Sequence, residues 1–150
     1  MSTSVTAAVT ALRDRLTEAA MHRFDVAEVV REIAEAVERC GLQPTRVSLA
    51  VLSLHPSLAG VGFTWHRTTG AVERLDRPYG FLSDPEHRAS PLHAVMTSRS
   101  ALRLRLHCGE GFDTFPVARD FAAAGGTDYV ALPLLSPRQD VHVFTMMTDS

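Results

Sequence analysis

The segment from residue 61 to residue 77 restricts the fold more than any other part of the sequence. Two strand-like runs, 61–67 (VGFTWHR) and 71–77 (AVERLDR), are separated by only three residues, TTG. A short connection containing glycine is typical of a β-hairpin, so the two runs are predicted to pair as antiparallel strands. We therefore expect the rest of the chain to build on an antiparallel sheet.

Helices are predicted before this hairpin and between later strands. Residues 5–20 place apolar side chains at three- and four-residue spacing, which indicates a leading helix. Asp25 is the predicted N-cap of a second helix, with Glu28 at the capping-box position and Gly41 as the C-terminal stop. Further helices are expected over 91–99, where Ser90 and Pro91 give a start signal, and over 115–124, capped by Asp113 or Thr114.

The remaining segments complete the order of elements. Residues 78–90 read as a loop. The predicted strands are 46–54, 61–67, 71–77, 101–107, 128–134 and 141–147. Because hairpins dominate and helices are inserted between strands, the fold class expected is α+β, with an antiparallel sheet of about six strands flanked by helices.

The stretch 125–134 (GGTDYVALPL) links a helix to one of these strands. Gly125 and Gly126 end the helix and reverse the chain, and Tyr129 begins a buried strand. Pro133 cannot donate a hydrogen bond to a neighbouring strand. It is therefore expected at an edge of the sheet or at a bulge.

Composition narrows the class of protein. The length of 150 residues suits a single domain, and no apolar run approaches the roughly 18 residues that span a membrane. The net charge is −2, the pI is about 6.4, and all 15 basic residues are arginine. Neither nucleic acid nor a membrane is favoured as a partner. We expect a cytoplasmic bacterial protein in which Cys40 and Cys108 are reduced.

Five short pieces of sequence occur in order between residues 20 and 149. They are GLQPTRVSLAVLSLHP, GFTWHR, SPLHAV, DTFPVARDFAAAGGTDYVALPL and FTMMTD. Together they resemble the region that precedes the catalytic domain in bacterial class III adenylate/guanylate cyclases. The last piece departs from that pattern, because Met146 and Met147 stand where smaller residues are usual.

The resemblance implies a GAF-like sensory domain over residues 1–150 that dimerises and regulates a C-terminal cyclase, which converts ATP to cyclic AMP. The cyclase domain is expected beyond residue 150, so this segment is expected to be non-catalytic. Residues 1–22 are a candidate dimerisation element, and residues 5–39 are expected to supply most of a homodimer interface. No cofactor is required by the sequence.

A ligand cavity would be walled by aromatic side chains and a few polar groups. The alternative is that the aromatic residues are plain core and that the histidine of His55-Pro56 holds loop backbone. The predicted ligand-binding residues are His55, Trp65, Arg67, Tyr79, Ser90, Arg105, Asp128 and Tyr129.

Other functions stay open at this stage. A haem sensor would use a single axial histidine, His55 or His93, whereas no pair of histidines has the spacing of a metal site. A small free-standing enzyme of similar fold is a further alternative. However, Cys108 and its neighbour His107 would point to opposite sides of a strand, so they do not form a nucleophile pair. No catalytic residue and no metal ligand set is predicted.

Overall fold

The structure is a computed structural model that describes residues 2–21, 25–52, 56–137 and 140–150. Its six strands form one sheet with the order β3-β2-β1-β6-β5-β4, and every neighbouring pair is antiparallel. The strands are β1 (Pro44–Leu52), β2 (Gly60–His66), β3 (Val72–Arg77), β4 (Leu102–Leu104), β5 (Asp128–Leu135) and β6 (Val141–Thr148). The predicted fold class is confirmed.

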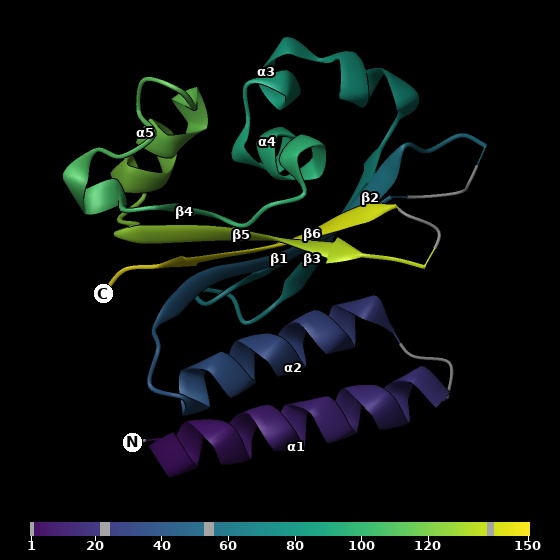
Figure 1. The fold of residues 1–150 in the computed structure, drawn as a ribbon, viewed down its shortest axis with the longest axis vertical. Coiled ribbons are helices and arrows are strands. Elements are labelled where there is room, and N and C mark those ends of the chain that lie inside the picture. The colour runs from purple at the N-terminus through teal and green to yellow at the C-terminus, as the bar shows by residue number, and fades with distance from the viewer. Residues whose placement is uncertain (1, 22–24, 53–55, 138–139) are drawn as a thin grey trace.

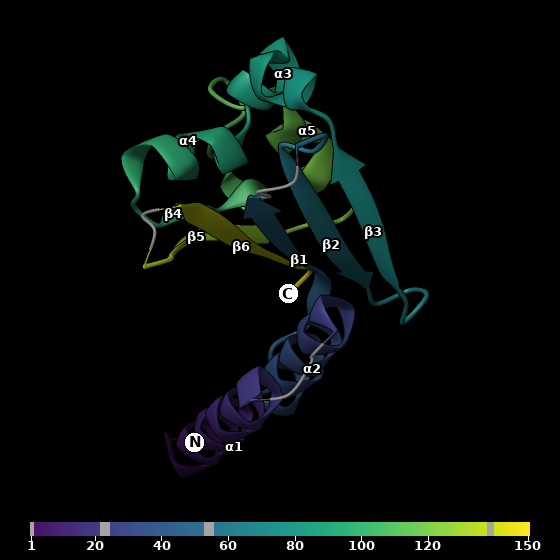
Figure 2. The same ribbon diagram turned by 90° about the vertical axis from the view of Figure 1, so that its right-hand side faces the viewer.

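Helices cover both faces of this sheet (Figures 1 and 2). The α-helices are α1 (Ser2–Met21), α2 (Val26–Arg39), α3 (Pro85–Arg88), α4 (Pro91–Ser98) and α5 (Pro116–Ala123). On one face α2 packs against the sheet and α1 lies on the outer side of α2. On the other face lie α3, α4 and α5, together with the short 3-10 helices η1 (Tyr79–Ser83) and η2 (Leu106–Cys108).

Strand alternation divides the buried side chains into two clusters, one on each face. Towards α2, Val47 and Trp65 pack with Val30 and Ala34. The cluster on the other face joins the sheet to α4 and α5. Its buried members are Val95, Leu104, Leu106, Ala118, Tyr129, Ala131, Val141, Val143 and Met147. The sheet is thus a central layer with side chains buried on both sides.

The predicted helix starts and the position of the strand proline agree with the structure. The Asp25 carboxylate accepts a hydrogen bond from the Ala27 amide at 2.9 Å, and the Ser90 hydroxyl accepts one from the His93 amide at 3.2 Å. Pairing of β5 with β4 ends opposite Ala131, so Pro133 has a neighbouring strand only in β6. Proline is tolerated there because that side of β5 is an edge.

Three local predictions are wrong. Residues 78–90 are not simply a loop, since they contain η1 and α3, whose start is capped by the Asp84 carboxylate. The strand predicted over 101–107 is only three residues long, because the chain turns into η2. The helix α5 begins after Phe115, and neither Asp113 nor Thr114 caps it.

In the described residues, no helix is both long enough and apolar enough to cross a bilayer.

Candidate functional site

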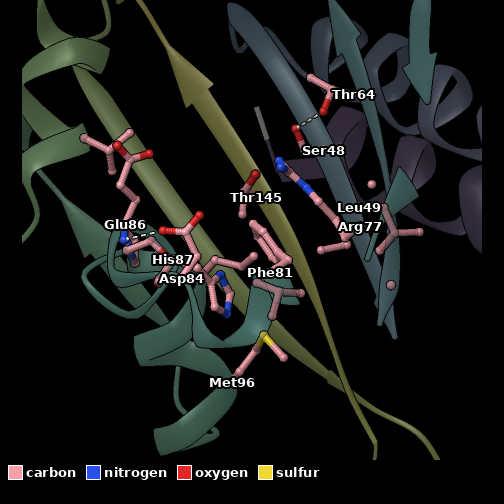
Figure 3. A pocket seen from close by; sticks show the side chains of 18 of the residues that line it. Ser48, Leu49, Thr64, Arg77, Phe81, Asp84, Glu86, His87, Met96 and Thr145 are labelled. Carbon is pink, nitrogen blue, oxygen red and sulfur yellow. Dashed lines mark hydrogen bonds between the residues drawn. The ribbon is translucent and has the colours of Figure 1, made fainter. Parts of the chain in front are cut away.

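A cavity of about 530 Å³ lies between the sheet and the helices η1, α3, α4 and α5. Figure 3 shows its interior, with strand side chains on one side and Phe81, His87 and Met96 on the other. The volume lies within the range of small-molecule pockets, roughly 300–1,000 Å³. The cavity is therefore large enough for a metabolite.

The sheet supplies a polar floor because of alternation along β1. Val47 points to the α2 face, whereas Arg46 and Ser48 take the opposite face and line the cavity. The Ser48 hydroxyl donates a hydrogen bond to the Thr64 hydroxyl at 2.9 Å. Thr145 lines the same cavity from β6. Three hydroxyl groups from three adjacent strands therefore face the space.

Two small residues on the sheet leave space above the strands on the cavity side. Ala50 and Gly62 are opposite each other in β1 and β2, and both line the cavity. A Cβ atom at Gly62 would have only the Leu75 carbonyl oxygen nearby, at 3.8 Å. The missing side chain at residue 62 therefore leaves open space.

Two arginines enter the cavity from the sheet. The Arg77 guanidinium lies over the Phe81 ring at 4.3 Å, and the Arg46 guanidinium lies over the Phe121 ring at 5.6 Å. The Nε atom of Arg46 is buried and has no hydrogen-bond partner. Burial lowers the pKa of Arg46; the neighbouring Tyr129 raises it and the positive charge of Arg77 lowers it further. The two arginines thus share one space and repel each other.

His87 is the most deeply buried polar group of the cavity. The residue is 4% exposed, and neither ring nitrogen has a hydrogen-bond partner. Its ring centroid lies 4.3 Å from that of Phe81 and 5.3 Å from that of His93. Burial lowers the pKa of His87, and the nearby His93 and Arg77 lower it further, against an opposing effect of Asp84. His87 is accordingly neutral at pH 7.

This lowered pKa predicts a pH dependence of folding. Above about pH 6.5, the ordinary histidine pKa, His87 is neutral in both the folded and the unfolded chain. As the pH falls below that value, His87 becomes protonated in the unfolded chain but stays neutral in the folded chain. The free energy of unfolding therefore decreases until the pH reaches the lower pKa of folded His87. His87→Phe should remove this part of the acid sensitivity in urea unfolding measured from pH 7 to pH 5. Equal slopes for the two proteins would contradict the prediction.

Tyr129 lines the cavity and lies near Arg46. Its ring stacks on Phe121 with centroids 5.0 Å apart. Burial raises the pKa of Tyr129 to about 12, although the nearby Arg46 charge and a hydrogen bond with Thr145 oppose the increase. The phenol is therefore a neutral hydrogen-bonding group at physiological pH.

Of the eight ligand-binding residues predicted from the sequence, two line the cavity: Ser90 and Tyr129. His55 lies outside the described residues. Trp65 does not line the cavity, because strand alternation turns it towards α2, on the far face of the sheet.

The other four predicted residues also lie away from the cavity. Arg67 forms an ion pair with Asp149, and Arg105 forms one with Glu110 at 3.0 Å. Asp128 is bonded to Arg103 at 2.7 Å, and Tyr79 is exposed on η1. Three of these side chains are thus engaged at the surface. We leave all four out of the candidate site.

The residues that sequence reasoning missed are Arg46, Arg77, His87, Ser48, Thr64 and Thr145. One signal was available for Arg46 and Ser48. They alternate with Val47 on a strand expected in the centre of a sheet, where both faces are covered. His87 lies in a segment that the sequence predicts as a loop, where no periodic pattern marks one residue as buried.

The described residues contain no cluster of side chains that could bind a metal ion. Across residues 2–21, 25–52, 56–137 and 140–150, no three His, Cys, Asp or Glu side chains come together as a set of ligands. Cys40 and Cys108 are both free thiols.

Comparison with known proteins gives a fold but no family. No protein-family model matches the chain, and no curated protein sequence does. Solved structures do match. The GAF domain of A. aeolicus nlh2, in an inactive state, superposes with a TM-score of 0.60 at 8% identity, over 97% of this chain and 82% of that one. This chain has a GAF-like fold.

Two further GAF domains support that statement. One belongs to a two-component sensor histidine kinase from Bacillus halodurans, with a TM-score of 0.54, 13% identity, and 84% of this chain and 78% of that chain covered. The other is the phycocyanobilin-bound GAF domain of a cyanobacterial phytochrome, with a TM-score of 0.58, 13% identity, and coverages of 97% and 80%. At these identities the GAF-like likeness concerns the fold alone.

Proposed function

We propose that this GAF-like chain is a non-catalytic sensory domain that binds a small molecule between its sheet and the helices α3 to α5. The observation that carries the proposal is His87, which is buried in the cavity wall with both ring nitrogens unpartnered. A buried polar group without a partner costs free energy, and native structures contain few of them. A ligand that supplies the partner offsets this cost.

A thermal-shift screen against metabolites tests the proposal. A ligand that binds only the folded state must raise the melting temperature. The matched control is Gly62→Leu, which places a side chain in the open space above the cavity floor. Compounds that stabilise the natural chain should not stabilise this variant. Stabilisation of both proteins to the same extent would place binding elsewhere.

We further propose that the domain regulates a class III adenylate cyclase in the same protein. Support comes from the five ordered pieces of sequence and from the GAF-like fold, which two of the matched signalling proteins share. A ligand would act by binding one of two arrangements of the domain more tightly than the other. The coding sequence beyond Ser150 tests this directly. Continuation into anything other than a cyclase domain would contradict the regulatory link.

The same proposal includes a homodimer built mainly from residues 5–39. Val5 and Val9, one helical turn apart on α1, are 42% and 57% exposed. Burial of both against a second copy would remove their apolar surface from water. We expect a dimer in sedimentation at micromolar concentrations and a shift to monomer in the double variant Val5→Glu, Val9→Glu. Thr10→Glu, exposed on the same helix, is the control. A monomeric natural chain would contradict the dimer.

A further inference from the structure

The charges around the cavity are unevenly distributed. Arg46 and Arg77 enter from the sheet, whereas the acidic lining residues Asp84, Glu86 and Asp120 are exposed and come from the helical side. The Asp84 carboxylate is already occupied, since it accepts the hydrogen bond of the Glu86 amide at 3.0 Å. Within the part of the chain that the structure describes, no carboxylate is within ion-pair distance of either arginine.

Other arginines of the chain behave differently. Arg15, Arg67, Arg74, Arg103, Arg105 and Arg119 each form an ion pair with an acidic side chain. Arg46 and Arg77 form no such pair within the described residues, and each lies against an aromatic face, which leaves its N–H donors unused. Two positive charges therefore face one cavity, and among the described residues the buried Nε of Arg46 has no hydrogen-bond partner. A negative charge placed between the two arginines would relieve their mutual repulsion.

Hydroxyl groups lie around the same position. Figure 3 shows the Arg77 side chain reaching across the cavity towards Ser48 and Thr145. The Ser48 hydroxyl donates to Thr64, which leaves the Thr64 hydroxyl as a donor beside the guanidinium groups. Such donors match the oxygen atoms of a carboxylate or a phosphate, which accept several hydrogen bonds at once. The sheet side of the cavity thus presents the positive charges and donors that anions bind.

The helical side is built for a different part of the ligand. Phe81, Leu92 and Met96 provide an apolar wall. His87 lies beside Phe81 and adds one donor and one acceptor, because its ring is neutral. An inorganic ion would leave this wall and the histidine without contacts in a cavity of about 530 Å³.

We propose that the ligand is a small organic anion whose carboxylate or phosphate lies between Arg46 and Arg77 and whose apolar body contacts Phe81 and Met96. This inference rests on the proposed sensory function and specifies its ligand class. The anionic group is held by the sheet and the body by η1 and α4, so one molecule joins the two layers.

Matched pairs of aromatic probes test the charge requirement on the natural chain. Benzoate is compared with benzamide, and phenyl phosphate with phenol, each at millimolar concentration and constant ionic strength. We expect the charged member of at least one pair to raise the melting temperature and to shift the NMR signals of His87, while its neutral partner does neither. The pair that responds distinguishes a carboxylate site from a phosphate site. Absence of any response overturns the proposal, as does an equal response to neutral probes.

Variants locate the site. Arg46→Met and Arg77→Met should each weaken binding of the charged probe about tenfold to a hundredfold, the effect of losing a charge-assisted hydrogen bond. Arg31→Met, which removes an exposed arginine on α2 at the other face of the sheet, should leave the affinity unchanged. Unchanged affinity in both cavity variants would overturn the inference.

The melting temperatures of Arg46→Met and Arg77→Met without ligand give a second test. Replacing either arginine removes one of two half-buried positive charges that repel each other and lack an ion-pair partner in the described residues, so each variant should melt at or above the temperature of the natural chain. A loss of stability similar to that of a core substitution would mean that the arginines serve the fold and would overturn the inference. If neutral metabolites bind instead and Gly62→Leu blocks them, the sensory function stands and only the anionic ligand class fails.

Discussion

Replacing Trp65 with alanine is expected to lower the free energy of unfolding by about 3–5 kcal/mol, the usual cost of deleting a buried aromatic side chain. Trp65 is 5% exposed and packs against Val30, Ala34 and Val47, which join α2 to the sheet. Alanine would leave a cavity at this contact between α2 and the sheet, and the neighbouring structure relaxes only partly around such a cavity. Urea unfolding measured by circular dichroism gives the loss.

The milder variant Trp65→Phe separates folding from binding. It keeps most of the apolar volume, so we expect a smaller loss of stability and no change in the affinity for a cavity ligand, because Trp65 faces α2. Normal stability together with lost ligand binding would show instead that Trp65 belongs to the site.

Gly126→Ala has the second largest expected effect, a loss of about 1–3 kcal/mol of unfolding free energy from overpacking. A Cβ atom at this buried position would lie 2.6 Å from the Met147 sulfur and 2.9 Å from the Phe121 carbonyl oxygen. The methionine can move, but the carbonyl belongs to the backbone of α5. We expect α5 to shift, and with it the Phe121 ring that stacks on Tyr129.

Gly80→Ala is the matched control for this substitution. Gly80 lies in η1, its backbone does not need glycine, and nothing is within 4 Å of a Cβ atom there. An exposed substitution of this kind usually changes stability by less than about 0.5 kcal/mol. Thermal unfolding gives the melting temperatures of both variants, which are compared with that of the natural chain. Equal melting temperatures for Gly126→Ala and the natural chain would show that α5 accommodates the methyl group without cost.

The elements of the fold were predictable where local chemistry alone decides them. Asp25 and Ser90 start helices through their own side chains, and the TTG connection closes the hairpin of β2 and β3. Residues 101–107 depend on a distant contact. Their alternation predicts a strand, but β4 ends at Leu104, beyond which the His107 amide binds the Thr127 carbonyl oxygen at 3.1 Å. That bond depends on a residue twenty positions away.

The candidate site was less accessible from the sequence, for the same reason. Tyr129 and Ser90 could be chosen from residue type and position, but their importance depends on which face of the sheet the helices α3 to α5 cover. Arg46 reads as a solvated strand residue until that second layer is known. Trp65 reads as a ligand contact until α2 is placed over it. Side-chain alternation gives two faces, and only tertiary packing assigns the cavity to one of them.

The strand β6 lies in the interior of the sheet although it is the last of the six strands in chain order and so the last of them to be synthesised. It pairs with β1 on one side and with β5 on the other. Among the strands of the described residues, β6 alone joins the segment β3-β2-β1 to the segment β5-β4. A nascent chain that still lacks Val141–Thr148 therefore carries two unfinished edges, which can recruit strands from other molecules. Completion of the sheet must wait until this segment has left the ribosome, so a stalled or slowly translated chain is most exposed to aggregation just before that moment.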